Sequence, residues 1–297
     1  TLLLLAIIAA MQGDRANAKR YALLGTERGQ LFDSPYMLSV GYMRQGEAWL
    51  LQKDAAGFAS AQQCFDQAIG ISQQLDLPRL RVEALWGLTQ LFGFQGRLAE
   101  AETAAKQGMD IARADGDEWI ATCIELTLGA SYVLARQFAE AQKMLETAVR
   151  HAADCRDHHG LAVELLWRCL LWHEQQDPIR LERDLTELLT LVAAHDYHFL
   201  LLKRTLLGPP DPRSLLPLLL FAREHTKQLG LVNDLLAQLN LERVEYHPGY
   251  QLRVQTLGHF AVQRGALGEV QPQDWKRIKA QELLLLFLTH RRLLHKE

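Results

Sequence analysis

The chain has 297 residues, of which 48% are apolar, and this is enough to bury a substantial core, so intrinsic disorder is excluded as the default state. Its formal net charge of −3 conceals an asymmetry, because residues 251–297 hold eight Lys/Arg against four Asp/Glu, leaving 24 against 31 in residues 1–250. The acidic body argues against general coating of nucleic acid, whereas the basic C-terminal segment can still contact phosphates.

The N-terminal apolar run and the cysteines bear on the compartment. Thr1–Met11 is apolar, but it is shorter than the roughly 20 residues that span a bilayer, so we expect a packed helix and no membrane partner. The cysteines (Cys64, Cys123, Cys155 and Cys169) form no CxxC pair and lack the spacing of a small disulfide-rich domain, which favours a cytoplasmic protein. Because the chain opens on Thr, we expect it to be a fragment of a longer protein.

A triplet of small or apolar residues at offsets of four and seven recurs every forty residues. The triplets are Ala61/Phe65/Ala68, Ala101/Ala105/Gly108, Ala141/Leu145/Ala148 and Leu181/Leu185/Leu188. These offsets place three side chains on one stripe of a helix, and the small ones let a neighbouring helix approach closely. Acidic or glycine- and proline-containing turns fall between the units, so the pattern predicts a mainly α array of helix pairs.

One unit carries the strongest family signal. The segment 128–148, with its Leu-Gly-x2-Tyr and Ala-x3-Leu-x2-Ala patterns, resembles the tetratricopeptide repeat, and the unit from Leu88 to Ala101 is a weaker match. Forty residues exceed the usual 34 of this repeat. The lengthened form resembles the sensor arrays of maltose-activator-type regulators, and HEAT-like helix pairs are the alternative that the longer period leaves open.

The resemblance implies an α-solenoid whose first helices line a concave binding surface for a protein or small-molecule ligand. The family's concave positions, carried over from the two best units, are Glu83, Trp86, Gln90, Phe94, Cys123, Leu126, Ala130 and Val133. The alternative is that these residues, Trp86 and Phe94 among them, belong to the core between repeats.

The repeat pattern ends near Pro209-Pro210-Asp211-Pro212, where two shorter helices are expected to cap the array. We therefore expect a helical array over residues 1–240 with degenerate ends. A polar linker over residues 241–250 follows, because it contains the helix-breaking sequence His247-Pro248-Gly249.

After the linker, apolar residues alternate as in two short strands, and a helix is expected over Lys276–Arg291. The order of LRVQTLGHFAVQRG, a tryptophan and KRIKAQELLLLFLTHRR resembles the start of the bacterial transcriptional activator domain, a winged helix of the OmpR type. The resemblance implies an incomplete α+β winged-helix module over residues 251–297, holding the N-terminal strands and the first helix. DNA is therefore an expected partner only if the winged helix is completed beyond residue 297.

Basic residues surround this helix. The candidates for phosphate contacts are Lys276, Arg277, Lys279, Arg291 and Arg292, and the alternative is a solvated basic face. The unbroken apolar run Leu283–Leu288 predicts that the helix is buried on more than one side.

Motifs of catalysis are not found in the sequence: there is no GxxxxGK[ST] loop, GxSxG elbow or HExxH helix. The nearest approach to a metal constellation is His151, Cys155, His158 and His159, but their spacing matches no established zinc pattern. We expect no catalysis, no metal and no cofactor.

The sequence patterns point to two alternative functions. The first is the signal-sensing or protein-interaction portion of a bacterial transcription regulator with an incomplete DNA-binding domain. The alternative is a tetratricopeptide scaffold that docks other proteins and does not bind DNA.

Overall fold

The computed structural model describes residues 1–241, 253–255, 260–264, 268–275 and 278–289. Contacts divide the chain into two compact units, Thr1–Glu245 and Tyr246–Glu297. This division falls within the segment expected to be a linker.

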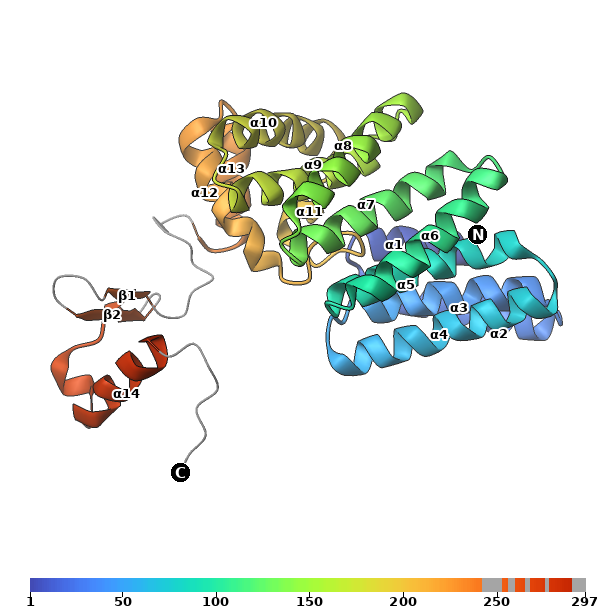
Figure 1. Ribbon diagram of the computed structural model, residues 1–297, viewed down its shortest axis with the longest axis horizontal. Coiled ribbons are helices and arrows are strands. Elements are labelled where there is room, and N and C mark those ends of the chain that lie inside the picture. The colour runs from blue at the N-terminus through green and yellow to red at the C-terminus, as the bar shows by residue number, and fades with distance from the viewer. Residues whose placement is uncertain (242–252, 256–259, 265–267, 276–277, 290–297) are drawn as a thin grey trace. The chain divides into compact units, whose positions relative to one another are not determined.

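The first unit is built from helices joined by short turns (Figure 1). Its α-helices are α1 (Leu2–Met11), α2 (Arg15–Leu31), α3 (Pro35–Leu50), α4 (Ala55–Gln74), α5 (Val82–Phe94), α6 (Leu98–Ala114), α7 (Glu118–Leu134), α8 (Phe138–Cys155), α9 (His158–Glu174), α10 (Pro178–His195), α11 (Phe199–Leu202), α12 (Leu216–His225) and α13 (Leu229–Gln238). Two 3-10 turns, η1 (Pro78–Arg81) and η2 (Pro212–Leu215), precede α5 and α12. The predicted mainly α fold is confirmed.

Helices pack in sequential pairs, α3 with α4, α5 with α6, α7 with α8 and α9 with α10. The first helices of successive pairs also contact each other, α5 with α7 and α7 with α9. This arrangement is consistent with an α-solenoid. None of the helices in the described part of the chain is long and apolar enough to cross a bilayer.

The helices of the array end in a common way. A residue with positive φ recurs every twenty positions, at Asp76, Gly96, Gly116, Arg136, Arg156, Gln176 and Asp196. The backbone N–H of the following residue then donates a hydrogen bond to a carbonyl oxygen near the end of the helix, as where Asp157 N donates to Ala152 O at 2.9 Å. The Oδ1 atom of Asp157 in turn accepts from Gly160 N at 2.8 Å and caps the following helix. Each forty-residue repeat is thus made of two halves of twenty residues.

The predicted triplets form the contact between helices, because every residue in the four of them is buried. Gly129 shows why small residues are needed: a Cβ atom there would lie 2.8 Å from the Cδ2 atom of Leu145. Its lack of a side chain therefore allows α7 to approach α8 closely.

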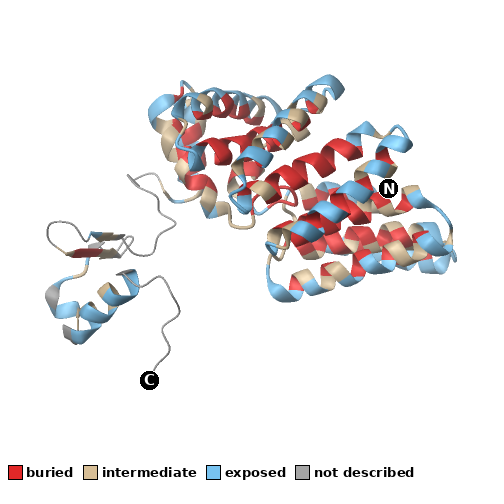
Figure 2. Cartoon of the chain, viewed as in Figure 1, coloured by how far each residue is buried: buried red, intermediate tan, exposed pale blue. Residues whose placement is uncertain are grey.

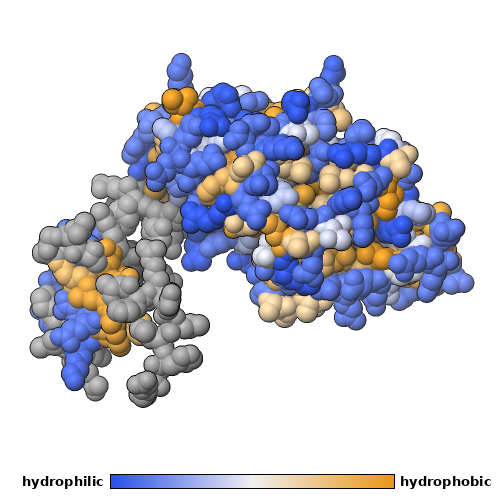
Figure 3. Space-filling view, in the orientation of Figure 1, coloured by the Kyte–Doolittle hydropathy of each residue, from blue (hydrophilic) through white to orange (hydrophobic). Residues whose placement is uncertain are grey.

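The two helices of a pair differ in burial. The second helices α6 and α8 are buried along one stripe only, whereas α5, α7 and α9 are buried over most of their length and circumference. Figure 2 shows this as nearly continuous red along α7 and α9. Polar residues cover most of the visible face of the array in Figure 3, in keeping with a core that lies along the first helices.

The second unit contains a small antiparallel sheet in the order β1 (Arg253–Gln255), β2 (Ala261–Arg264) and β3 (Gly268–Glu269). The two short strands expected from the alternating pattern are present, and Val254 pairs with Val262. Gly268 begins the short third strand, β3. A 3-10 turn, η4 (Pro272–Asp274), leads to helix α14 (Ile278–Thr289).

Helix α14 differs from expectation in its burial. The apolar run was predicted to be buried on more than one side, but Leu283 is 50% exposed and Phe287 is 53% exposed. The reason is that the run places apolar side chains all round the helix, more than the three short strands described here can cover.

Candidate binding site

The inner face of the array, formed by α5, α7 and α9, is covered by the segment that joins α11 to η2. Leu206 N donates to the carbonyl oxygen of Ala10 at 3.0 Å, and Leu206 O accepts from Gln90 Nε2 at 2.5 Å. Leu207 O accepts from the indole Nε1 of Trp167 at 2.8 Å. Helices α1, α5 and α9 therefore hold this segment through its main chain, and both leucines are buried.

The predicted groove residues of α5 are engaged inside the array. Trp86 is 2% exposed, and its Nε1 atom donates to the Oγ1 atom of Thr127 on α7 at 2.8 Å. The Glu83 carboxylate pairs with the guanidinium of Arg44. Phe94 lies beneath the ammonium group of Lys53, 3.6 Å from the ring centroid.

The four predicted groove residues of α7 are buried, and three of them line one or other of two hollows. Cys123 and Leu126 line a cavity against Leu207 of the covering segment. Val133, one turn beyond Ala130, borders a separate hollow near Pro209. The structure therefore brings Cys123 and Leu126 to one site and places the other predicted residues elsewhere on the inner face, and their contact with a ligand stays a prediction.

The cavity lies between α7, α8 and α9 and encloses about 20 Å³, room for roughly one water-sized group. Its lining comprises Met11, Trp119, Thr122, Cys123, Leu126, His151, Ala152, Cys155, Asp157, His159, Gly160, Glu164 and Leu207. Burial raises the pKa of the Cys123 thiol well above its usual value. Cys123 therefore contributes to the lining as a neutral, weakly polar group and not as a thiolate.

Glu164 is the most unusual residue of this lining. Its side chain is 1% exposed, and its Oε2 atom is buried without a hydrogen-bond partner. Burial, followed by the nearby carboxylates of Asp157 and Glu125, raises the pKa of Glu164 to about 9, although Arg168 acts in the opposite direction. Near neutral pH this carboxyl group is therefore protonated.

His159, at the start of α9, places a second unsatisfied atom in the lining. Its Nε2 atom is buried and has no hydrogen-bond partner, and burial lowers its pKa, so the imidazole is neutral near pH 7. Beside it, Asp157 Oδ2 accepts from the indole Nε1 of Trp119 at 3.0 Å. Two buried polar groups of one cavity thus lack partners in the part of the chain that the structure describes.

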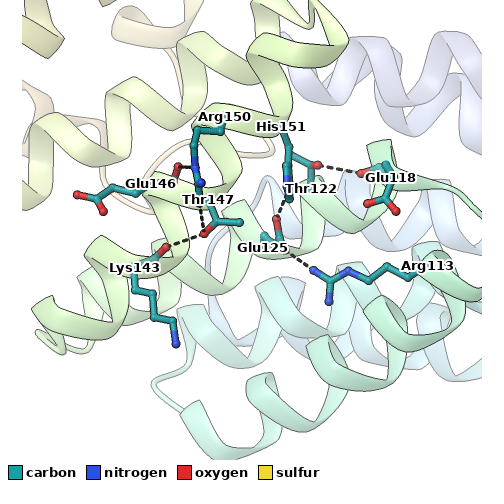
Figure 4. Close-up of polar contacts among 9 residues, drawn as sticks. All are labelled: Arg113, Glu118, Thr122, Glu125, Lys143, Glu146, Thr147, Arg150 and His151. Atoms are coloured by element: carbon teal, nitrogen blue, oxygen red, sulfur yellow. Dashed lines mark hydrogen bonds and ion pairs between the residues drawn. The ribbon is translucent and has the colours of Figure 1, made fainter.

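The carboxylate of Glu125 lies behind the cavity and is fully satisfied. Figure 4 shows it between Arg113, whose guanidinium donates to Oε1, and His151, whose Nδ1 atom lies 3.1 Å from Oε2. Glu125 is 3% exposed, so its charge is held in place by these two partners. It therefore adds negative potential near the cavity without itself being open to a ligand.

The four residues considered for a metal do not meet as a ligand set. His158 stacks on His195 with 4.5 Å between ring centroids, while the Nδ1 atom of His151 contacts the carboxylate of Glu125. Within the described residues, no group of three or more His, Cys, Asp or Glu side chains is placed to hold a metal ion.

Four of the five candidate phosphate contacts, Lys276, Arg277, Arg291 and Arg292, lie outside the described residues. Lys279 lies on α14 and is exposed. Its contact with phosphate stays a prediction.

Glu164 and the covering segment were not foreseen from the sequence. A signal for Glu164 was present, because it is the lone carboxylate in the apolar run Leu161–Trp167. However, the equivalent position one repeat earlier is Ile124, which is not among the concave positions carried over from the family. The covering segment carries no periodic pattern and left no comparable signal.

The protonation of Glu164 predicts how a substitution will respond to pH. Because the folded-state pKa of about 9 lies above the ordinary 4.5, the folded chain holds a proton between these pH values that the unfolded chain has released. Stability is therefore lost as pH rises through this window, by up to about 1.4 kcal/mol per pH unit. Glutamine does not titrate, so the Glu164→Gln variant does not undergo this pH-dependent loss of stability. The difference in unfolding free energy, variant minus parent, should therefore increase between pH 5.5 and 8.5. Urea unfolding at the two pH values measures it, and a difference independent of pH would contradict the assignment.

Comparisons with known proteins give no assignment: no protein-family model matches the chain, and no curated protein matches it.

Proposed function

We propose that the chain is the signal-sensing portion of a bacterial transcription regulator, in which the helical array binds its ligand on the inner face of α5, α7 and α9. The observation that carries this proposal is the cavity between α7, α8 and α9, which joins two predicted concave residues, Cys123 and Leu126, to two buried polar atoms without partners, on Glu164 and His159. Buried polar groups are ordinarily hydrogen-bonded, so unsatisfied ones in a cavity are a reason to expect a ligand.

The regulatory part of the proposal is supported by the second unit. Its meander of short strands followed by a helix is compatible with the resemblance to the bacterial transcriptional activator domain, and it forms a compact unit of its own. In the domain that the second unit resembles, a recognition helix and a wing read the DNA sequence. The array would then pass the ligand-binding signal to the DNA-binding domain.

Chromatin immunoprecipitation from the organism that encodes this chain tests the proposal. The chromosomal copy carries an epitope tag, and we expect enrichment at discrete promoters. A matched strain lacking the module from Tyr246 onward should lose this enrichment, and an untagged strain gives the background. Uniform recovery of DNA by the tagged protein, equal to that background, would contradict a role in transcription.

A second candidate function, a protein-interaction scaffold, is favoured by one observation. The inner face already accommodates a non-helical main chain, since the side chains of Gln90 and Trp167 donate to carbonyl oxygens of the segment that contains Leu206 and Leu207. A surface with such donors suits an extended peptide. This function would be supported if the tagged protein recovered stable protein partners and no promoter DNA.

A further inference from the structure

The cavity between α7, α8 and α9 continues into a wider cleft. The two hollows share Met11, Trp119, Asp157 and His159, and the outer one has a volume of about 430 Å³. Its remaining lining residues are Ile8, Gln12, His195, Asp196, Tyr197 and Phe199. A ligand entering here meets a broad, open cleft first and a pocket for one small group at its inner end.

Aromatic rings dominate one wall of the outer cleft. Tyr197 lies edge-on to His159 with 5.5 Å between ring centroids, and Phe199 packs against Tyr197 at 5.9 Å. Trp119 is 43% exposed and borders both hollows. These rings offer flat apolar surface and negatively polarised faces, which suit an aromatic ring and a nearby cation.

Charge at the inner end favours a cation over an anion. The Asp157 carboxylate belongs to the cavity lining and the Glu125 carboxylate lies behind it, while Glu164 is a neutral carboxyl group until a cation binds beside it. The nearest buried guanidinium, that of Arg168, is paired with Asp184 at 2.8 Å and is not among the lining residues. An anionic head group would therefore meet the Asp157 carboxylate, and the lining holds no lysine or arginine to receive it.

We propose that this site binds a small aromatic amine, whose ammonium group enters the cavity and donates to Glu164 Oε2 and His159 Nε2, while its ring lies against Trp119 and Tyr197. The proposal rests on the proposed sensing function and names its ligand class. An ammonium group has the size of a water molecule and three N–H donors, which matches the room in the cavity and the two acceptors without partners. His159 accepts through Nε2 when its proton is on Nδ1.

Binding has a consequence for protons. Glu164 is protonated near neutral pH, and an adjacent ammonium group favours its carboxylate form. The amine binds as RNH₃⁺, the Glu164 carboxyl group becomes a carboxylate, and one proton passes to the buffer. A hydroxyl group in place of the ammonium would release no proton.

Isothermal titration calorimetry of the full chain tests this, with 2-phenylethylamine as the probe at pH 7.5 in phosphate and in Tris. The buffers differ in ionisation enthalpy, so the difference in observed heat reports the number of protons released. We expect release approaching one proton per amine bound. The neutral isostere 2-phenylethanol and the anion 3-phenylpropionate should bind at least tenfold more weakly.

Two variants make the test specific. Glu164→Gln keeps the shape of a side chain that is already neutral, so it should fold normally, yet it should weaken amine binding at least tenfold and abolish proton release. Glu140→Gln, at an exposed position of α8 outside the lining, should bind as the parent does. Far-UV circular dichroism checks that both variants are folded.

Three results would overturn the proposal: equal affinity for the alcohol, amine binding unchanged by Glu164→Gln, or no amine binding by the folded parent. Failure of amine binding alongside discrete promoter enrichment would reject this ligand class and leave the regulator proposal standing. Amine binding without promoter enrichment would reject the regulator proposal and leave the ligand site standing.

Discussion

Replacing Asp184 with alanine is expected to lower the free energy of unfolding by about 3–5 kcal/mol, because it leaves the buried guanidinium of Arg168 without its ion-pair partner. Asp184 is 1% exposed, and its Oδ2 atom accepts from the indole of Trp172 at 2.7 Å and pairs with Arg168 at 2.8 Å. Trp172 is fully buried and Arg168 is 9% exposed, so neither can turn to water without disturbing the contact of α9 with α10.

Chemical denaturation of the purified chain measures this loss. The matched control is Asp110→Ala on α6, an exposed aspartate, which should change stability by less than about 0.5 kcal/mol. Replacing the pair together, with Arg168→Met and Asp184→Leu, should restore part of the loss because no unpaired charge remains. A loss below about 1 kcal/mol for Asp184→Ala would show that Arg168 finds solvent or another partner.

Phe65→Ala is expected to cost about 3–5 kcal/mol, the range for deleting a buried aromatic side chain. The ring of Phe65 is fully buried and fills the space left by two glycines, since a Cβ atom on Gly46 or Gly87 would lie 2.5 or 2.3 Å from it. Its removal opens a cavity between α3, α4 and α5 that backbone cannot readily fill.

The control for Phe65 is Phe32→Ala, which removes the same side chain from a position that is 66% exposed. Thermal unfolding of both variants provides the comparison, and Phe32→Ala should shift the midpoint little. Equal shifts for the two variants would contradict the packing of Phe65 between the three helices.

The regular part of the array could be predicted because its signals are local. A helix stripe such as Ala141, Leu145 and Ala148 depends only on spacing along one helix, and all three are buried as the spacing predicts. The turns also follow from nearby residues, as where Asp157 begins α9. Local pattern therefore gave the helix pairs and their forty-residue repeat.

The site itself depends on contacts between distant parts of the chain. Gln90 and Leu206 are 116 residues apart in sequence, and nothing in the pattern around Leu206 indicates that its carbonyl group accepts a hydrogen bond from a side chain of α5. Glu164 shares its cavity with residues of α1, α7 and α8 and with Leu207, which come from distant parts of the chain. Spacing could place residues on the inner faces of α5 and α7, but it could not show which of them the chain itself would cover.

Hydrogen–deuterium exchange of the full chain, with and without saturating 2-phenylethylamine, tests most directly whether ligands bind on the inner face. We expect slower exchange in peptides from the start of α7, the start of α9 and residues 195–208, with α6 and residues after 245 unchanged. Slower exchange confined to α6 or to the second unit, or no change anywhere at saturating amine, would contradict the assignment of the inner face as the binding site.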